Sequence, residues 1–118
     1  MDLTLKDADG ETVALSSLAG PGRWVLLDFW ATWCGPCCRE IPYLKEAYAA
    51  FSGRGFSIYA VSIDHDAARW QRFLAENDLP WTNVLSPGCG KQSPAAAMYG
   101  IRFIPSNFLI SPDGVIVA

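Results

Sequence analysis

The apolar residues of this chain follow two patterns, continuous runs and runs at helical spacing. Residues 24–30 are apolar on both faces, which is typical of a central strand in a covered sheet. Residues 56–63 predict a second buried strand. Between them, residues 35–51 carry apolar side chains at spacings of three and four, which predicts a helix. The inward face of this helix is expected to hold Ile41, Leu44, Tyr48 and Phe51.

The rest of the chain predicts shorter elements. The turn signal Asp9-Gly10 lies between two short alternating segments and predicts an N-terminal β-hairpin. Asp66 can cap a helix that runs to about Asn77. We further expect an extended piece over residues 81–85, a short helix over residues 94–100, and a closing hairpin of residues 106–110 and 115–117. Strands that first alternate with helices and then end in a hairpin predict a mixed sheet with helices on both faces.

Composition and charge narrow the class of protein. With 118 residues, 51% of them apolar, residues 1–118 are expected to form a single domain. The formal charge of −3 argues against a nucleic-acid partner, because no basic stripe is present to neutralise phosphates. The longest apolar run is broken by Asp28, so no stable membrane insertion is expected. The N-terminus carries no signal-peptide pattern, which leaves a cytoplasmic protein or, as we favour, a piece of a longer chain.

The most informative motif is a C-x-x-C pair, Cys34 and Cys37, between the predicted strand and the predicted helix. Such a pair serves either as half of a zinc site or as a redox disulfide. A zinc site needs a second pair of ligands, and the remaining candidates, Cys38, His65 and Cys89, show no such spacing. Haem attachment needs a histidine after the second cysteine, where Cys38 stands instead. We therefore predict a redox pair, with no metal and no cofactor.

The position of Cys34 favours it as the nucleophile. It lies where a strand ends and a helix begins, so that unpaired backbone amides and the helix dipole stabilise its thiolate. Cys37, one helical turn on, is placed to resolve a mixed disulfide. Gly35 and Pro36 keep the ring small, and Pro36 suits a first turn because it lacks an N–H that would go unused there.

Residues 28–37, Asp-Phe-Trp-Ala-Thr-Trp-Cys-Gly-Pro-Cys, resemble the active-site segment of thioredoxin. Glu40 and Pro42, together with residues 104–110 and 111–116, resemble the TlpA/ResA-like branch of extracytoplasmic thiol–disulfide oxidoreductases. The likeness covers essentially the whole chain. It implies a thioredoxin-like α/β fold, a three-layer α/β/α sandwich with a mixed central sheet and an N-terminal β-hairpin extension. The activity it implies is dithiol–disulfide exchange.

The resemblance also implies roles for two acidic residues. Asp28 interrupts a strand otherwise built for burial, and in thioredoxin the matching acid shuttles the proton of the second cysteine, here Cys37. A lone buried carboxylate usually has a raised pKa; the alternative is a solvated Asp28 at an edge. Glu40 matches an acid that ResA-like proteins use near their cysteines, and its alternative is a solvated helix residue.

Three further residues are expected to contact substrate. The proline that faces the disulfide in this family is cis, which predicts a cis Ile104–Pro105 bond and exposes the backbone of Ile104 for β-like pairing with substrate. Trp33 is expected to shield Cys34 and offer a flat contact, with packing alone as the alternative.

Two cysteines lie outside the motif. Cys38 is interpreted as an incidental thiol, although it could compete for the disulfide. Cys89 could be a resolving or regulatory thiol.

The resemblance implies a reductive role toward disulfide-containing protein substrates outside the cytoplasm, periplasmic or membrane-anchored. The reducing electrons would come from a membrane-bound or thioredoxin-like donor.

Two alternative functions stay open. One is a thiol peroxidase of the AhpC/TSA group, which wants a Pro and a Thr before its cysteine and an Arg, whereas only Thr32 is near here. The other is a non-catalytic binding module that keeps the fold.

Overall fold

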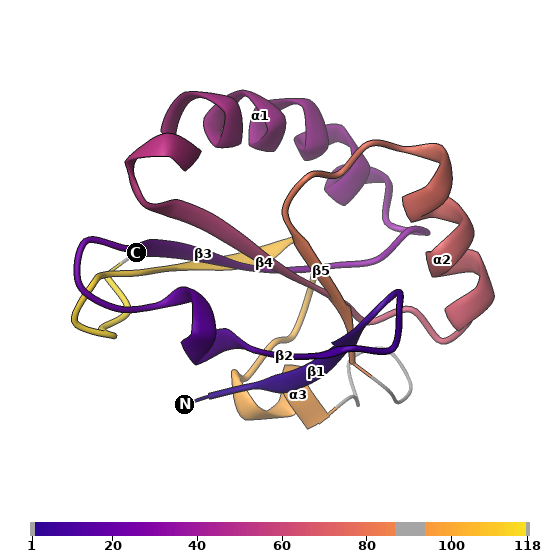
Figure 1. The fold of residues 1–118 in the computed structure, drawn as a ribbon. Helices are drawn as coiled ribbons and strands as arrows, with labels where there is room; N and C mark the ends of the chain where they lie inside the picture. Colours follow the sequence, from indigo (N-terminus) through magenta and orange to yellow (C-terminus); the bar gives the residue numbers. More distant parts are fainter. Residues whose placement is uncertain (1, 87–93, 118) are drawn as a thin grey trace.

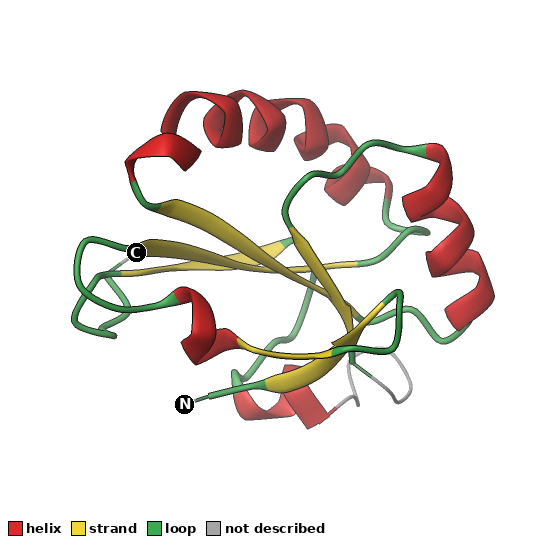
Figure 2. Cartoon of the chain, viewed as in Figure 1, coloured by secondary structure: helices red, strands yellow, loops and turns green. Residues whose placement is uncertain are grey.

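The computed structural model describes all residues except 1, 87–93 and 118 (Figure 1). The described residues form strands and helices that alternate and then end on a strand, as the apolar pattern predicts (Figure 2). In chain order the elements are β1 (Thr4–Asp7), β2 (Thr12–Ala14), η1 (Leu15–Leu18), β3 (Trp24–Trp30), α1 (Gly35–Phe51), η2 (Ser52–Arg54), β4 (Phe56–Ser62), α2 (Ala67–Glu76), β5 (Thr82–Leu85), α3 (Pro94–Met98) and β6 (Ser106–Ile110).

The described strands form one sheet in the order β2-β1-β5-β4-β3-β6. β3 pairs with β4, and β4 with β5, in parallel, whereas β6 pairs antiparallel with β3. The N-terminal hairpin of β1 and β2 joins the sheet through an antiparallel pairing of β1 with β5. The mixed sheet and its hairpin extension are therefore confirmed.

Helices cover both faces of the sheet, as the side chains of β3 demonstrate. Successive strand residues point to opposite faces. The ring of Trp30 lies 5.5 Å from that of Phe73 in α2, whereas the ring of its neighbour Phe29 lies 5.7 Å from that of Tyr99, which follows α3. Figure 1 shows α1 over one face of the sheet and α3 beneath the other. The expected three layers are confirmed.

The predicted second strand of the closing hairpin is wrong. Residues 115–117 make only an isolated bridge, between Ile116 and Ile110, and Val117 donates a backbone hydrogen bond to Leu109. The side chains of Val115, Ile116 and Val117 are about half exposed. A strand needs continuous pairing as well as apolar residues, and these three residues have only one bridge and the backbone hydrogen bonds on either side of it.

The inward face of α1 is confirmed for Ile41, Leu44 and Tyr48, which pack against the core. Phe51 is an exception, because its side chain is 49% exposed. It is the last residue of α1, and its ring contacts that of Phe56 at 6.5 Å, at the margin of the core. Helical spacing alone does not tell how far along a helix the core extends.

Candidate active site

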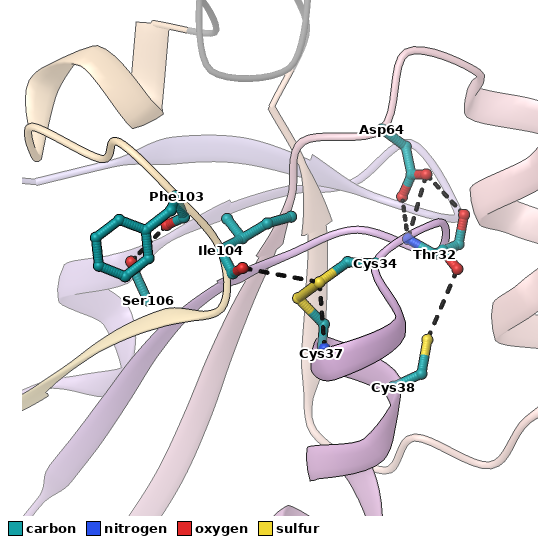
Figure 3. Close-up of a disulfide and its surroundings, with 8 residues drawn as sticks. All are labelled: Thr32, Cys34, Cys37, Cys38, Asp64, Phe103, Ile104 and Ser106. Atoms are coloured by element: carbon teal, nitrogen blue, oxygen red, sulfur yellow. Dashed lines mark hydrogen bonds between the residues drawn. A yellow bond between two sulfur atoms is a disulfide. The ribbon is translucent and has the colours of Figure 1, made fainter.

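The two cysteines of the motif form a disulfide at the start of α1, so the predicted pairing is confirmed (Figure 3). Cys34 is the N-cap residue of α1, and its sulfur accepts a hydrogen bond of 3.2 Å from the backbone N–H of Cys37. Pro36 lies in the first turn, where its missing N–H costs nothing. Both cysteines are buried. A charge on Cys34 would face an N–H donor and the positive end of the helix dipole.

The loop before β6 brings a distant segment to the disulfide. The Ile104–Pro105 bond is cis, which confirms the prediction. The carbonyl oxygen of Ile104 lies 3.9 Å from the sulfur of Cys34 (Figure 3). The hydroxyl of Ser106 donates a hydrogen bond of 2.6 Å to the carbonyl of Phe103 and closes this loop. The loop therefore places a backbone segment directly beside the disulfide.

Asp28 is buried in β3, with only 4% of its surface exposed, so the solvated alternative is wrong. It lies two residues from Trp30, hence on the sheet face that α1 and α2 cover. Its Oδ1 atom has no hydrogen-bond partner among the described residues. Burial raises the pKa of Asp28 to about 7, with a further contribution from the negative charge of Glu40, and a hydrogen bond with Asn107 opposes the rise. Asp28 can therefore gain or lose a proton near neutral pH.

Glu40 lies in α1 and is half-buried, so it is neither a fully solvated residue nor a core residue. Its negative charge acts on Asp28, which places the two predicted acidic residues in one electrostatic unit. The sequence identified both residues, but their coupling across α1 and β3 requires the fold.

Two exposed aromatic side chains precede the residues that meet at the disulfide. Trp33 precedes Cys34 and is 50% exposed. It lines a groove of about 420 Å³ together with His65, Asp66 and Arg69. Phe103 is 68% exposed and precedes Ile104. The exposure of Trp33 leaves a face free for contact, and its role toward substrate stays a prediction. Phe103 was missed, and the exposed aromatic next to the Ile-Pro pair is the signal that could have found it.

Asp64, a buried acid that follows β4, is a further residue of the site and was not predicted from the sequence. Its carboxylate accepts hydrogen bonds from the backbone N–H and the hydroxyl of Thr32 and from the hydroxyl of Ser62. Thr32 lies two residues before Cys34, so Asp64 holds the loop that leads into the disulfide (Figure 3). Its position at the end of a predicted parallel strand could have drawn attention to it, because such ends meet at one edge of a sheet.

The two remaining cysteines are Cys38 and Cys89. Cys38 is free and half-buried, and its sulfur lies 3.6 Å from the carbonyl oxygen of Thr32. Cys89 lies outside the described residues. Among the described side chains, no three of His, Cys, Asp or Glu form a group that could hold a metal ion. Within the same part of the chain, every helix is too short or too polar to cross a bilayer.

Comparisons with known proteins agree with this geometry. The profile of the AhpC/TSA family matches residues 1–118. The chain is 37% identical over 111 residues to the thiol-disulfide oxidoreductase ResA of Oceanobacillus iheyensis, covering 94% of this chain and 55% of that protein. It is 34% identical over 117 residues to the ResA of Halalkalibacterium halodurans, covering 99% of this chain and 63% of that protein. The chain thus spans less than two thirds of these curated relatives.

The crystal structure of the thioredoxin domain of a thiol-disulfide oxidoreductase from Bacteroides vulgatus is also similar. It superposes with a TM-score of 0.88 at 35% sequence identity and covers 100% of this chain and 82% of that one. The thioredoxin-like fold that the resemblance implied is therefore confirmed.

Proposed function

The chain belongs to the AhpC/TSA family, and we propose that it acts as a thiol–disulfide oxidoreductase through the Cys34–Cys37 pair. The observation that carries the proposal is the disulfide at the first turn of α1, faced by the cis Ile104–Pro105 loop. Neither a structural staple nor a zinc half-site needs a helix N-terminus on one side and an open backbone segment on the other. Exchange with a polypeptide disulfide uses both.

In the reduced protein, Cys34 is the nucleophile. Its thiolate attacks one sulfur of a substrate disulfide and forms a mixed disulfide, while the other substrate sulfur leaves as a thiolate and takes up a proton. Cys37 then attacks the sulfur of Cys34 and releases the second substrate thiolate. The substrate gains two electrons, and the protein returns to the disulfide form. The N–H of Cys37, 3.2 Å from the Cys34 sulfur, supports the thiolate in the first step.

Asp28 is proposed to accept the proton of Cys37 before the second step. A proton acceptor works best when its pKa lies near the working pH, and the pKa of Asp28 is raised to about 7. Its unpartnered Oδ1 is free to take a proton. Glu40 contributes by keeping that pKa high, which makes it a tuning residue for the shuttle and not an acid that touches substrate.

Substrate binding is assigned to the loop before β6 and to Trp33. The Ile104 carbonyl lies beside the Cys34 sulfur, so an extended substrate segment that paired with this backbone would present its disulfide to Cys34. Trp33, half exposed beside the nucleophile, offers a flat apolar contact. The substrates are accordingly proteins that contain disulfides.

The proposal also covers the direction of electron flow, the electron donor and the location of the protein. The Gly-Pro pair between the cysteines supports a reductive role. The resemblance to the TlpA/ResA-like branch supports a location outside the cytoplasm and electrons supplied by a membrane-bound or thioredoxin-like donor. A redox titration of the Cys34–Cys37 pair tests the direction. A midpoint near −270 mV is expected for a thioredoxin-like reductant, and a value near −120 mV would assign an oxidant.

The activity itself is tested by insulin-disulfide reduction. Cys34→Ser is expected to lose turnover completely, because the thiol at the helix N-cap that attacks substrate is removed and Cys37 is left without the partner with which it closes the disulfide. Cys37→Ser is expected to accumulate a covalent mixed disulfide that a reductant dissolves. Cys38→Ser is the matched control, one residue further along the helix, and is expected to keep turnover. Turnover that survives in Cys34→Ser would refute the assignment.

The same variants separate the rival functions. A peroxidase site would use a threonine before its cysteine, but the hydroxyl of Thr32 donates to Asp64 at 2.7 Å and is thereby engaged away from the nucleophile. Hydrogen peroxide consumption faster than insulin reduction would assign a peroxidase instead. A Cys37→Ser variant that traps no disulfide substrate would favour a binding module.

A further inference from the structure

A third cysteine, Cys38, lies beside the redox pair and takes no part in the proposed thiol–disulfide exchange. Cys38 follows Cys37 directly and lies four residues, about one helical turn, after Cys34. It is half-buried and free. Residues four apart share one face of a helix, so a Cys38 thiolate released from the Thr32 carbonyl would become a competitor of Cys37 for the Cys34 sulfur. The pairing therefore depends on what holds Cys38.

Two contacts link Cys38 to Asp64. The Cys38 thiol donates a hydrogen bond of 3.6 Å to the carbonyl oxygen of Thr32. The backbone N–H and the hydroxyl of the same Thr32 donate to Asp64, at 3.1 Å and 2.7 Å (Figure 3). Ser62 supplies a third donor to this carboxylate, which is 2% exposed. Asp64 thereby fixes the carbonyl that Cys38 binds.

Burial and the charge of Asp64 act on Cys38 in the same sense as its hydrogen bond, whereas the charge of Arg69 opposes them. Burial raises the pKa of the Cys38 thiol, the negative charge of Asp64 at the end of β4 raises it further, and the positive charge of Arg69 in α2 lowers it. A thiol that keeps its proton can donate to a carbonyl, whereas a thiolate would be repelled both by that carbonyl and by Asp64.

We propose that Asp64 is a positioning residue that keeps Cys38 a protonated hydrogen-bond donor and thereby confines exchange to Cys34 and Cys37. The proposal rests on the proposed function in so far as exchange gives the confinement its use. Asp64 touches neither the disulfide nor the loop at Ile104 in any contact described above, and it acts through Thr32 and through its charge.

The oxidised protein provides a direct test, because the disulfide protects Cys34 and Cys37. In a Cys89→Ser background, Cys38 is the sole free thiol of the chain, and its alkylation by iodoacetamide can be followed from pH 6 to pH 10. The midpoint of this pH profile is compared with that of the same protein unfolded in urea. Asp64→Asn is compared with Asp66→Asn, which removes the same charge two residues away and still caps α2, since Asn caps about as well as Asp.

The folded protein is expected to have a higher midpoint than the unfolded chain. Asp64→Asn is expected to move the midpoint to lower pH. Each unit of this change raises the thiolate fraction at neutral pH about tenfold, and the alkylation rate about threefold because a less basic thiolate is a weaker nucleophile. Asp66→Asn is expected to leave the midpoint in place. Thr32→Val, which keeps the Asp64 charge but removes one donor, is expected to change the midpoint less than Asp64→Asn.

Each contrary outcome overturns the proposal. If the alkylation midpoint of Cys38 in the folded wild type lies at or below that of the unfolded chain, the proposal is wrong. This comparison needs no variant, so it holds even if Asp64→Asn fails to fold. An equal change in Asp64→Asn and Asp66→Asn, or a rate that rises at every pH with no change of midpoint, would assign Asp64 a structural role only. Insulin reduction is measured separately, so failure of the proposed function and failure of this inference are distinguishable.

Discussion

Replacing the buried carboxyl of Asp28 by an amide should remove a pH dependence from the stability of the protein. The pKa of Asp28 is raised from 3.8 to about 7, mainly by burial. The folded protein therefore binds the proton of Asp28 more tightly than the unfolded chain does. This difference stabilises the folded state fully below about pH 4, and the stabilisation is lost as the pH rises to about 7. At 1.36 kcal/mol for each unit, the loss amounts to about 4 kcal/mol.

Urea unfolding of the oxidised protein at pH 4 and pH 8 measures this loss. The amide of Asp28→Asn cannot ionise, so this loss is absent from the variant. The free energy of unfolding of Asp28→Asn minus that of the wild type is therefore expected to be about 4 kcal/mol larger at pH 8 than at pH 4. The matched control is Asp78→Asn, because Asp78 carries the same charge but is exposed; it should follow the wild type at both pH values. A difference between Asp28→Asn and wild type that is the same at pH 4 and pH 8 would refute the reasoning.

Two further predictions concern the site and the fold. Glu40→Gln is expected to lower the pKa of Asp28, because the negative charge of Glu40 contributes to raising it; an unchanged midpoint in the NMR titration of the Asp28 carboxyl would contradict this coupling. Gly55→Ala is expected to cost about 2 kcal/mol or more in urea unfolding, because φ is +89° there and a Cβ would lie 2.1 Å from the Gly22 carbonyl oxygen. Gly53→Ala, where a Cβ meets nothing within 4 Å, should cost far less, and equal losses would contradict the steric argument.

The features that the sequence could predict are those decided within a few residues. The Cys34–Cys37 pair and the Asp66 cap each depend on partners two or three positions away. The burial of Asp28 follows from its place in an apolar run, because a single polar residue does not move a central strand to the surface. The cis bond before Pro105 came from family resemblance, since the residues alone do not specify an isomer.

The features that the sequence could not predict are those decided by pairing across the fold. Asp64 meets Thr32 over 32 positions, and an acid after a strand has the same composition whether it is solvated or anchors a loop. The assignment of residues 115–117 to a strand failed because strand formation depends on a partner along the whole length. The inward assignment of Phe51 failed because the core ends one turn before the helix does.

The two buried carboxylates, Asp28 and Asp64, have different surroundings, which supports the different roles proposed for them. The parallel strands β3 and β4 end at the same edge of the sheet, and the antiparallel β6 begins there, so that Cys34, Asp64 and the Ile104 loop converge. Asp64 receives three donors, which hold its carboxylate in one place and one orientation. Asp28 retains an oxygen with no partner among the described residues and lies near the charge of Glu40. A carboxylate whose two oxygens both accept hydrogen bonds is suited to hold a loop and repel a nearby thiolate, whereas one with an unpartnered oxygen is suited to exchange a proton. The different roles proposed for the two acids therefore rest on how many hydrogen bonds the fold gives to each.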